Sequence, residues 1–353
     1  MRRFSLFFVI ALAMLASTGL VLQSQTEGPY KVLKTAKVGG AGGFDYVYAD
    51  SDGRRLYIPR TGQAPTGRIT VYNLDTLESV GEIPNTNARG VAVDPKSGHA
   101  FASSSPVAMW DTKTLALIKT IDVQGGPDGI LFDPFNSRVW VFSHRTPNAT
   151  IINAADGTIV STLDLGGAPE QAVTDGKGHM YVDLEDKDMI AVVDTKELKV
   201  TGQYGLEGKG GGPGGLAFDV KNHILFASCH NPATMVILNS ETGKIITALP
   251  IGMGTDGATF NPATMEAFSS NRDATLTVIK ENSPTDFVVE QNVKTMNLAK
   301  TLSLDSKTGH ILLIAADTQP APPPPADAPP PPPGRGPRMV MVPDSFTILS
   351  VGK

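Results

Sequence analysis

Residues 126–142 read GPDGILFDPFNSRVWVF, and this stretch contains the pattern that decides the fold. A short apolar run ends at Asp133, the Asp-Pro pair favours a turn, and a second apolar run begins at Val139. β-branched and aromatic residues dominate both runs. This composition is typical of two short antiparallel strands rather than of a helix.

The same pattern recurs seven times along the chain. In each copy an apolar run ends at an Asp or Asn, and consecutive copies lie 39 to 44 residues apart. Four short strands in about 42 residues are typical of one propeller blade. The sequence therefore predicts an all-β, seven-bladed β-propeller of four-stranded blades, with a β-sandwich as the alternative. The anchor residues of the seven units are Asp50, Asp94, Asp133, Asp175, Asp219, Asn261 and Asp305.

The two ends of the repeat region complement each other. The seventh unit supplies only three strands, and the segment before the first unit, YKVLKTAKVGG, is similar to the fourth-strand sequence LALIKTIDVQGG. We expect Tyr30–Val38 to complete the last blade, because closing the ring removes two exposed sheet edges.

Three sequence elements carry a resemblance to a known family. GPDGILFDP, ARGVAVDP and GPGGLAFD match its first element, AFSSN approximates the second, and VYNLDT and VVDTKE match the third. On these elements the chain resembles the YVTN-repeat (YncE-like) seven-bladed β-propellers over residues 30–351. The resemblance implies a periplasmic binding module. The sequence itself contains no G-x-S-x-G, H-E-x-x-H or P-loop motif.

Composition limits the classes of function. The chain has 353 residues, 36 Gly, 27 Pro and a net charge of −5, which becomes −7 without Arg2 and Arg3. A surface of that sign is a poor match for nucleic acid. The single cysteine, Cys229, excludes an internal disulfide and any multi-cysteine metal site.

The N-terminus has the layout of an export signal. Two arginines precede an apolar run that extends to Leu22. We expect residues 1–26 to be a signal peptide and residues 27–353 to be one monomeric propeller in a bacterial periplasm or secreted. An uncleaved membrane anchor is the alternative, since the apolar run from Phe4 to Leu22 is almost long enough to span a bilayer. No later apolar stretch is long enough.

Charged residues recur at one position of the repeat. The residue five places before each anchor begins a first strand, so these residues should form a ring around one end of the channel. Five of them could neutralise one another, and we expect Glu170 to be the least compensated, with a raised pKa. The ring consists of Asp45, Arg89, Asp128, Glu170, Gly214, Asp256 and Lys300.

The loops after the second strands should face the same end of the channel. His144 and His230 would flank Glu170, so the three could bind a divalent metal or form an acid–base pair. The alternative is that these histidines simply face solvent in their loops. Their spacing in the sequence matches no local metal-binding motif. These loops contribute Arg60, His144, Arg145, Glu185, Asp186, His230, Asn231, Asn271 and Arg272.

Other features are expected to be structural. We expect Cys229 to be buried and inert, and residues 317–338, which contain eleven prolines, to form a loop inserted in blade seven. The remaining histidines recur at the turn into the second strand, at the other end of the channel. They are His99, His179, His223 and His310.

Two functions follow from this reading. The first is a noncatalytic scaffold that presents its charged face to a periplasmic protein, a peptide or a small molecule, and needs no cofactor. The second is a lactonase-like hydrolase or lyase that would use Glu170, His144 and His230, with Arg145 or Arg272 holding an anion and with a divalent metal as an option.

Overall fold

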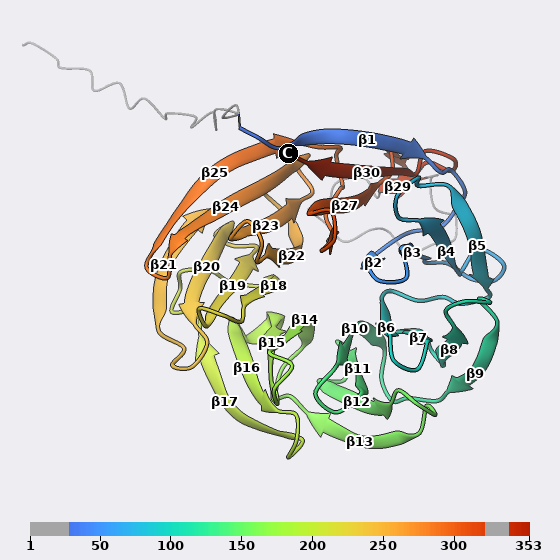
Figure 1. The fold of residues 1–353 in the computed structure, drawn as a ribbon, viewed down its shortest axis with the longest axis horizontal. Helices are drawn as coiled ribbons and strands as arrows, with labels where there is room; N and C mark the ends of the chain where they lie inside the picture. Colours follow the sequence, from blue (N-terminus) through green and yellow to red (C-terminus); the bar gives the residue numbers. More distant parts are fainter. Residues whose placement is uncertain (1–27, 322–338) are drawn as a thin grey trace, which may run out of the picture.

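The computed structural model describes residues 28–321 and 339–353. In this part of the chain, seven four-stranded antiparallel sheets stand around a central axis (Figure 1). In each blade the first strand lies nearest the axis and the fourth strand forms the outer wall. The predicted seven-bladed, all-β ring is therefore confirmed.

The blades follow the order of the chain, and only the last blade combines both ends of it. The first three blades are β2 (Tyr48–Asp50), β3 (Arg55–Arg60), β4 (Arg68–Asn73) and β5 (Ser79–Pro84); β6 (Val91–Asp94), β7 (His99–Ala102), β8 (Val107–Asp111) and β9 (Leu117–Ile121); and β10 (Pro127–Asp133), β11 (Arg138–Ser143), β12 (Asn148–Asn153) and β13 (Ile159–Asp164). The next three are β14 (Pro169–Thr174), β15 (His179–Leu184), β16 (Met189–Asp194) and β17 (Lys199–Gly205); β18 (Pro213–Asp219), β19 (Ile224–Cys229), β20 (Thr234–Asn239) and β21 (Ile245–Pro250); and β22 (Thr255–Asn261), β23 (Glu266–Asn271), β24 (Thr275–Ser283) and β25 (Asp286–Lys294). Blade seven is β26 (Leu302–Asp305), β27 (His310–Ala315), β30 (Thr347–Gly352) and β1 (Lys31–Lys37), and a 3₁₀ helix, η1, spans Glu185–Lys187.

The predicted anchors form the turns between first and second strands. Asp94 Oδ1 accepts a hydrogen bond from the amide of Lys96 at 2.9 Å, and Asn261 Oδ1 accepts one from Ala263 at 3.0 Å. Such Asx turns satisfy backbone donors where a strand reverses. All anchors therefore lie at one end of the ring, which we call the opposite mouth. The other end, where first strands begin and second strands end, is the charged mouth.

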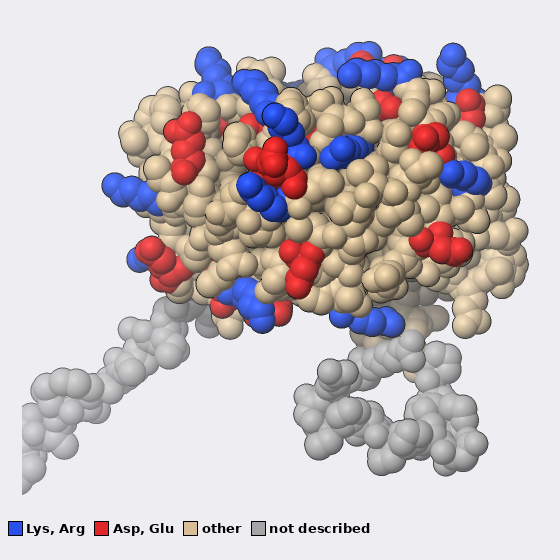
Figure 2. Space-filling model, turned by 90° about the horizontal axis from the view of Figure 1, so that it is seen from below, with Lys and Arg blue, Asp and Glu red and all other residues tan. Residues whose placement is uncertain are grey.

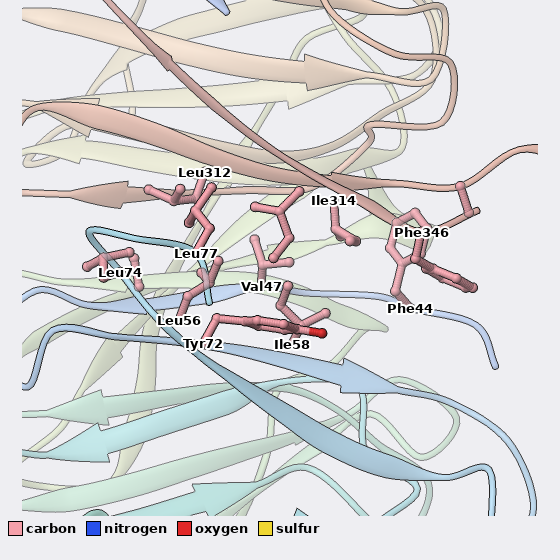
Figure 3. Close-up of a cluster of buried hydrophobic side chains, with 13 residues drawn as sticks. Phe44, Val47, Leu56, Ile58, Tyr72, Leu74, Leu77, Leu312, Ile314 and Phe346 are labelled. Atoms are coloured by element: carbon pink, nitrogen blue, oxygen red, sulfur yellow. The ribbon is translucent and has the colours of Figure 1, made fainter. Parts of the chain in front are cut away.

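The hydrophobic core lies between the blades. The described residues form seven buried clusters, one for each pair of neighbouring blades. Alternation along a strand produces this arrangement, because Leu56 and Ile58 face blade seven whereas Tyr57 of the same strand faces blade two. Figure 3 shows the cluster between blades seven and one.

The predicted N-terminal closing strand is also confirmed. Strand β1 pairs antiparallel with β30 along its length. Just before β1, Tyr30 donates its hydroxyl to Glu266 at 2.5 Å, and Lys353 Nζ contacts the same carboxylate at 2.8 Å. The Gln291 side chain accepts a hydrogen bond from the Tyr30 amide at 2.9 Å and donates one to the Tyr30 carbonyl at 2.7 Å. Tyr30 and Lys353 are thus both held against blade six.

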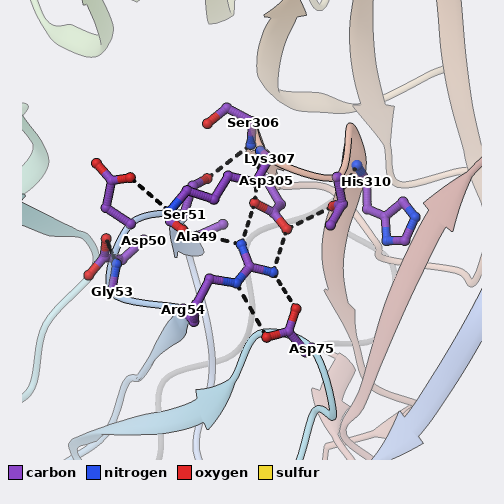
Figure 4. A network of polar contacts seen from close by, with 12 residues as sticks. Ala49, Asp50, Ser51, Gly53, Arg54, Asp75, Asp305, Ser306, Lys307 and His310 are labelled. Atoms are coloured by element: carbon purple, nitrogen blue, oxygen red, sulfur yellow. Dashed lines mark hydrogen bonds and ion pairs between the residues drawn. The ribbon is translucent and has the colours of Figure 1, made fainter.

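At the opposite mouth, ion pairs join blades seven and one. Arg54 donates to both oxygens of Asp305 at 2.8 and 2.9 Å and also contacts Asp75 (Figure 4). Burial opposes the ionised form of Asp305, but the bonds from Arg54 hold the pKa of that carboxyl below its usual range. This network adds a polar link to the apolar contacts of the same interface.

The predicted insertion begins directly after the second strand of blade seven. Its two sides pair as a small hairpin, β28 (Thr318–Pro320) with β29 (Met339–Met341). The rest of the insertion, residues 322–338, and the expected signal peptide, residues 1–26, lie outside the described residues. Within residues 28–321 and 339–353, no helix has the length and apolar character needed to cross a membrane.

The outer wall of the ring has no dominant charge on the side that Figure 2 shows. Acidic and basic side chains are interspersed there with uncharged surface. The charged mouth, by contrast, concentrates titratable groups.

Candidate functional site

Local backbone irregularities direct the ring residues into the charged mouth. In four blades the pairing of the first and second strands shifts register at the start of the first strand. A β-bulge at such a point turns a side chain away from its regular direction. The shifted segments contain the ring positions Asp128, Glu170, Gly214 and Asp256.

Five ring residues neutralise one another as ion pairs. Asp45 contacts Arg89 at 2.7 Å and Lys300 at 2.8 Å. Lys300 also contacts Asp256, and Arg89 Nε lies 3.7 Å from Asp128 Oδ1. The charges alternate over these five of the seven ring positions, as the sequence order allowed.

The expectation that Glu170 is the least compensated residue is wrong. Its Oε1 accepts a hydrogen bond from the Tyr46 hydroxyl at 2.5 Å, and its Oε2 lies 3.2 Å from His144 Nδ1. Tyr46 precedes the first strand of blade one, whereas Glu170 lies in β14 of blade four. The tyrosine therefore reaches across the axis of the ring, which sequence spacing within one blade could not reveal.

A second side chain crosses the centre of the ring beside Tyr46. Gln171 Oε1 accepts hydrogen bonds from the amides of Leu216 and Ala258, both at 3.1 Å, and its Nε2 donates to the Ala258 carbonyl at 3.0 Å. Tyr46 and Gln171 line one channel cavity of about 190 Å³ together with Glu170. They place polar side chains across the channel, and we call the charged mouth above them the bowl.

The loop histidines are linked through Glu185 of η1. Its Oε2 lies 3.5 Å from His144 Nε2, and its Oε1 lies 3.8 Å from His230 Nε2. The glycine in the ring makes room for this arrangement, since a Cβ on Gly214 would lie 2.9 Å from His230 Nε2. His230 thus occupies the space that a side chain at the fifth ring position would fill.

Burial and crowding of carboxylates shift several pKa values. Burial and the charge of Glu170 raise the pKa of Asp128 to about 7. The hydrogen bond with Glu170 raises the pKa of His144 to about 9, although burial opposes this. Burial, and secondarily Glu170, raise the pKa of Glu185 and of the fully buried Asp183. At neutral pH the bowl therefore contains a charged His144 beside the carboxyl groups of Asp128, Glu170 and Glu185.

The candidate metal ligands differ from the predicted set. One potential ligand atom each of Asp128, His144 and Glu170 lies within 4.8 Å of the others. His230 is joined to this group only through Glu185. The sequence named all four residues but grouped His144 with His230 rather than with Asp128.

Arg60 does not belong to the open surface of the charged mouth, contrary to the prediction. Its side chain is buried, its guanidinium lies 3.5 Å from the ring centroid of Phe346, and it donates to the carbonyls of Gly39 and Ala41 at 3.1 Å. Burial lowers the pKa of Arg60 to about 10. By contrast, Arg145 and Arg272 are exposed, and Arg272 lies 3.5 Å from Asp256.

Cys229 and two of the histidines that we expected to be structural lie outside the bowl. Cys229 is buried, and burial raises the pKa of its thiol. His99 Nδ1 lies 3.0 Å from the Ala154 carbonyl, and His179 Nδ1 lies 2.9 Å from Asp175. Both histidines stand at the start of a second strand, at the opposite mouth.

Sequence reasoning missed two residues of the bowl, Tyr46 and Gln171, and the buried Asp183 that interacts electrostatically with Glu170 and Glu185. Tyr46 and Gln171 each follow a ring residue directly, so adjacency to Asp45 and Glu170 was the available signal. Asp183 was marked only by its charge within the apolar strand HMYVDL. None of these signals states which blade a side chain reaches.

Comparisons with known proteins support the fold alone. No family model and no curated protein matches the chain, so the resemblance to YVTN-repeat proteins rests on its sequence elements. Among solved structures, the chain is similar to the WD40 repeats of RRP9 (TM-score 0.70, 10% identity, 92% of this chain and 99% of that chain) and to U3-55K (TM-score 0.69, 10% identity, 91% and 98%). It is also similar to a chain of the mitotic checkpoint complex (TM-score 0.65, 9% identity, 88% and 95%). The chain thus shares the seven-bladed propeller fold of WD40 proteins.

Proposed function

We propose that this chain is an exported, YncE-like binding propeller that holds a periplasmic protein, peptide or small molecule in the bowl of the charged mouth. The fold is typical of protein-binding scaffolds, and the neighbour in the mitotic checkpoint complex belongs to a protein assembly. Export is inferred from the layout of residues 1–22. Periplasmic recovery of the full chain, and its loss when residues 1–26 are removed, would test that part.

The observation that carries the proposal is the concentration of polar groups at one mouth, above side chains that reach across the channel. The first strands and second-strand loops of at least six blades contribute charged or imidazole side chains to one mouth. Tyr46 and Gln171 reach across the channel beneath them. A polar bowl with many donors and acceptors can orient a ligand by several directed bonds at once.

The bowl offers both signs of charge at different places. Asp128, Glu170 and Glu185 form an acidic side, whereas Arg145 and Arg272 are exposed guanidinium groups. A ligand that carries a cationic group and an anionic group would match this distribution. Guanidinium groups favour carboxylate or phosphate partners.

Quantitative capture from periplasmic extract tests the proposal. Glu170→Gln and Arg272→Ala are expected to weaken retention of a captured partner about tenfold without lowering the melting temperature. Asp52→Asn and Lys307→Ala are matched controls, because these residues form an exposed ion pair at the opposite mouth. Equal retention by all four variants would contradict binding in the bowl.

A lactonase-like hydrolase or lyase is the second candidate. The contacts from Glu170 through His144 and Glu185 to His230 favour it, because paired carboxylates and imidazoles can exchange protons with a bound substrate. Turnover of a lactone panel that is lost in Glu170→Gln would support this candidate. Absence of turnover in the wild-type protein would exclude it for the panel tested.

A further inference from the structure

We propose that Asp128, His144 and Glu170 bind one divalent transition-metal ion, best represented by Zn²⁺, at the wall of the bowl. This inference rests on the proposed function, since it names a chemical group through which the bowl would hold its ligand. The three side chains come from two neighbouring blades, with Asp128 and His144 in blade three and Glu170 in blade four.

The geometry brings three ligand atoms together. One atom of each residue lies within 4.8 Å of the others, and only small side-chain adjustments separate this spacing from the distances at which Zn²⁺ is bound, about 2.0–2.2 Å from each ligand. The backbone is fixed by packing, because a Cβ on Gly129 would lie 2.4 Å from the Glu170 carbonyl oxygen. The two first strands are therefore held close enough for their carboxylates to share an ion.

An unsatisfied carboxylate atom is an independent indication of a ligand. Asp128 Oδ1 is inaccessible to solvent and accepts no hydrogen bond from residues 28–321 or 339–353. Arg89 Nε lies 3.7 Å away, beyond hydrogen-bonding distance. A buried acceptor without a donor is costly, and a metal ion would satisfy it.

Neighbouring charge also favours a cation. Besides Asp128 and Glu170, Glu185 lies 3.5 Å from His144. The fully buried Asp183 interacts electrostatically with Glu170 and Glu185, and neither of its oxygens has a hydrogen-bond partner within the described ranges. The carboxyl groups of Asp128, Glu170 and Glu185 thus lie around one imidazole. Arg89 offsets part of this negative charge, since it contacts Asp45 at 2.7 Å and lies 3.7 Å from Asp128.

The donor set selects the class of metal. One imidazole with two carboxylates suits Zn²⁺ and related first-row ions, whereas Ca²⁺ and Mg²⁺ prefer oxygen ligands alone. His144 would release its ring proton to solvent when Nδ1 binds the ion. Glu170 Oε1 would keep the hydrogen bond from Tyr46. Three protein ligands leave a coordination position that faces the bowl and can accept an anionic group of the bound partner.

Calorimetric titration of the chelator-treated full chain with ZnCl₂ tests this site. The wild-type protein is expected to bind one equivalent with a dissociation constant below about 10 µM. Asp128→Asn and His144→Ala are each expected to weaken binding at least about tenfold. His179→Ala is the matched control, because it removes a histidine that also contacts an aspartate, at the opposite mouth.

The outcomes separate the two proposals. Absence of a Zn²⁺ signal, or equal loss in His179→Ala, would overturn the metal site. If capture still depends on Glu170 and Arg272 in that case, the binding function stands without the metal. Stoichiometric Zn²⁺ binding together with capture that is unaffected by bowl variants would support the metal site and overturn the bowl as the partner surface. Melting curves of Asp128→Asn and His144→Ala would identify any loss caused by unfolding.

Discussion

At the scale of single residues, equivalent repeat positions have different roles. Arg60 ends a second strand, as Ser143 does in blade three, yet its guanidinium is buried over Phe346. Gly214 occupies a ring position without a side chain, and His230 fills the space. The sequence placed these residues at the correct end of the ring, but their surroundings depend on segments far along the chain.

The space at Gly214 leads to a prediction about His230. We expect Gly214→Ala to displace the His230 imidazole, because the new Cβ would lie 2.9 Å from Nε2. The contact with Glu185 should weaken, and the NMR signals of the His230 ring should shift. Gly205→Ala is the control, since a Cβ there has no neighbour within 4 Å. Unchanged His230 signals in Gly214→Ala would contradict this packing.

At the scale of strands and turns, the sequence predicted most of the structure. The anchors, the four strands per unit and the closing segment Tyr30–Val38 were all readable, because turn chemistry and alternation are local properties. The position of the charged ring was readable for the same reason. The contacts of Tyr46 with Glu170 and of Gln171 with Ala258 were not, since they cross the axis between non-adjacent blades.

A buried carboxyl between blades five and six provides a pH prediction. Burial raises the pKa of Glu281 to about 7, and Asn222 donates to it at 2.8 Å. The folded state therefore holds this proton more tightly than the unfolded state, and stability falls as the pH rises from about 4.5 to about 7. Glu281→Gln should remove this loss, so its melting temperature should exceed that of the wild type at pH 8.

Comparing Glu281→Gln with the wild type at low pH controls for any effect of the glutamine amide other than the loss of the charge. At pH 4 both states of the wild-type protein are largely protonated at this carboxyl, so the advantage of Glu281→Gln should disappear. An advantage of equal size at pH 4 and pH 8 would mean that ionisation of Glu281 is not its cause.

The hairpin at the base of the insertion defines how much of it can be removed. Val342 N donates to the Asp317 carbonyl at 2.8 Å, and Asp317 N donates to Ser345 Oγ at 3.0 Å, so Asp317 contributes to blade seven. Replacing residues 322–338 by a short Gly-Ser turn should leave the melting temperature unchanged. Removing residues 317–338 should lower it, and equal melting temperatures for both deletions would contradict a structural role for the hairpin.

At the scale of the whole molecule, stability and site depend on closure of the ring. Blade seven combines β1 from the beginning of the chain with β26, β27 and β30 from its end. Asp45 of blade one contacts Lys300, which precedes β26. The charged ring can therefore be complete only when both ends of the chain are paired.

Removal of the closing strand should affect the entire propeller. A chain that begins at residue 39 lacks β1 and the contacts of Tyr30 with Glu266 and Gln291. It is expected to melt at least about 10 °C lower, because β30 loses its partner strand and the buried Glu266 carboxylate loses one of its two donors. A chain that begins at residue 28 is the control, and equal melting of the two truncated chains would contradict closure by β1.

The most direct test of the functional account is a crystal structure of the full chain with ZnCl₂, recorded at the zinc absorption edge. We predict seven blades and one anomalous peak at the charged mouth, about 2.0–2.2 Å from Asp128, His144 and Glu170. A different number of blades, or zinc bound elsewhere with these three side chains apart, would contradict the account.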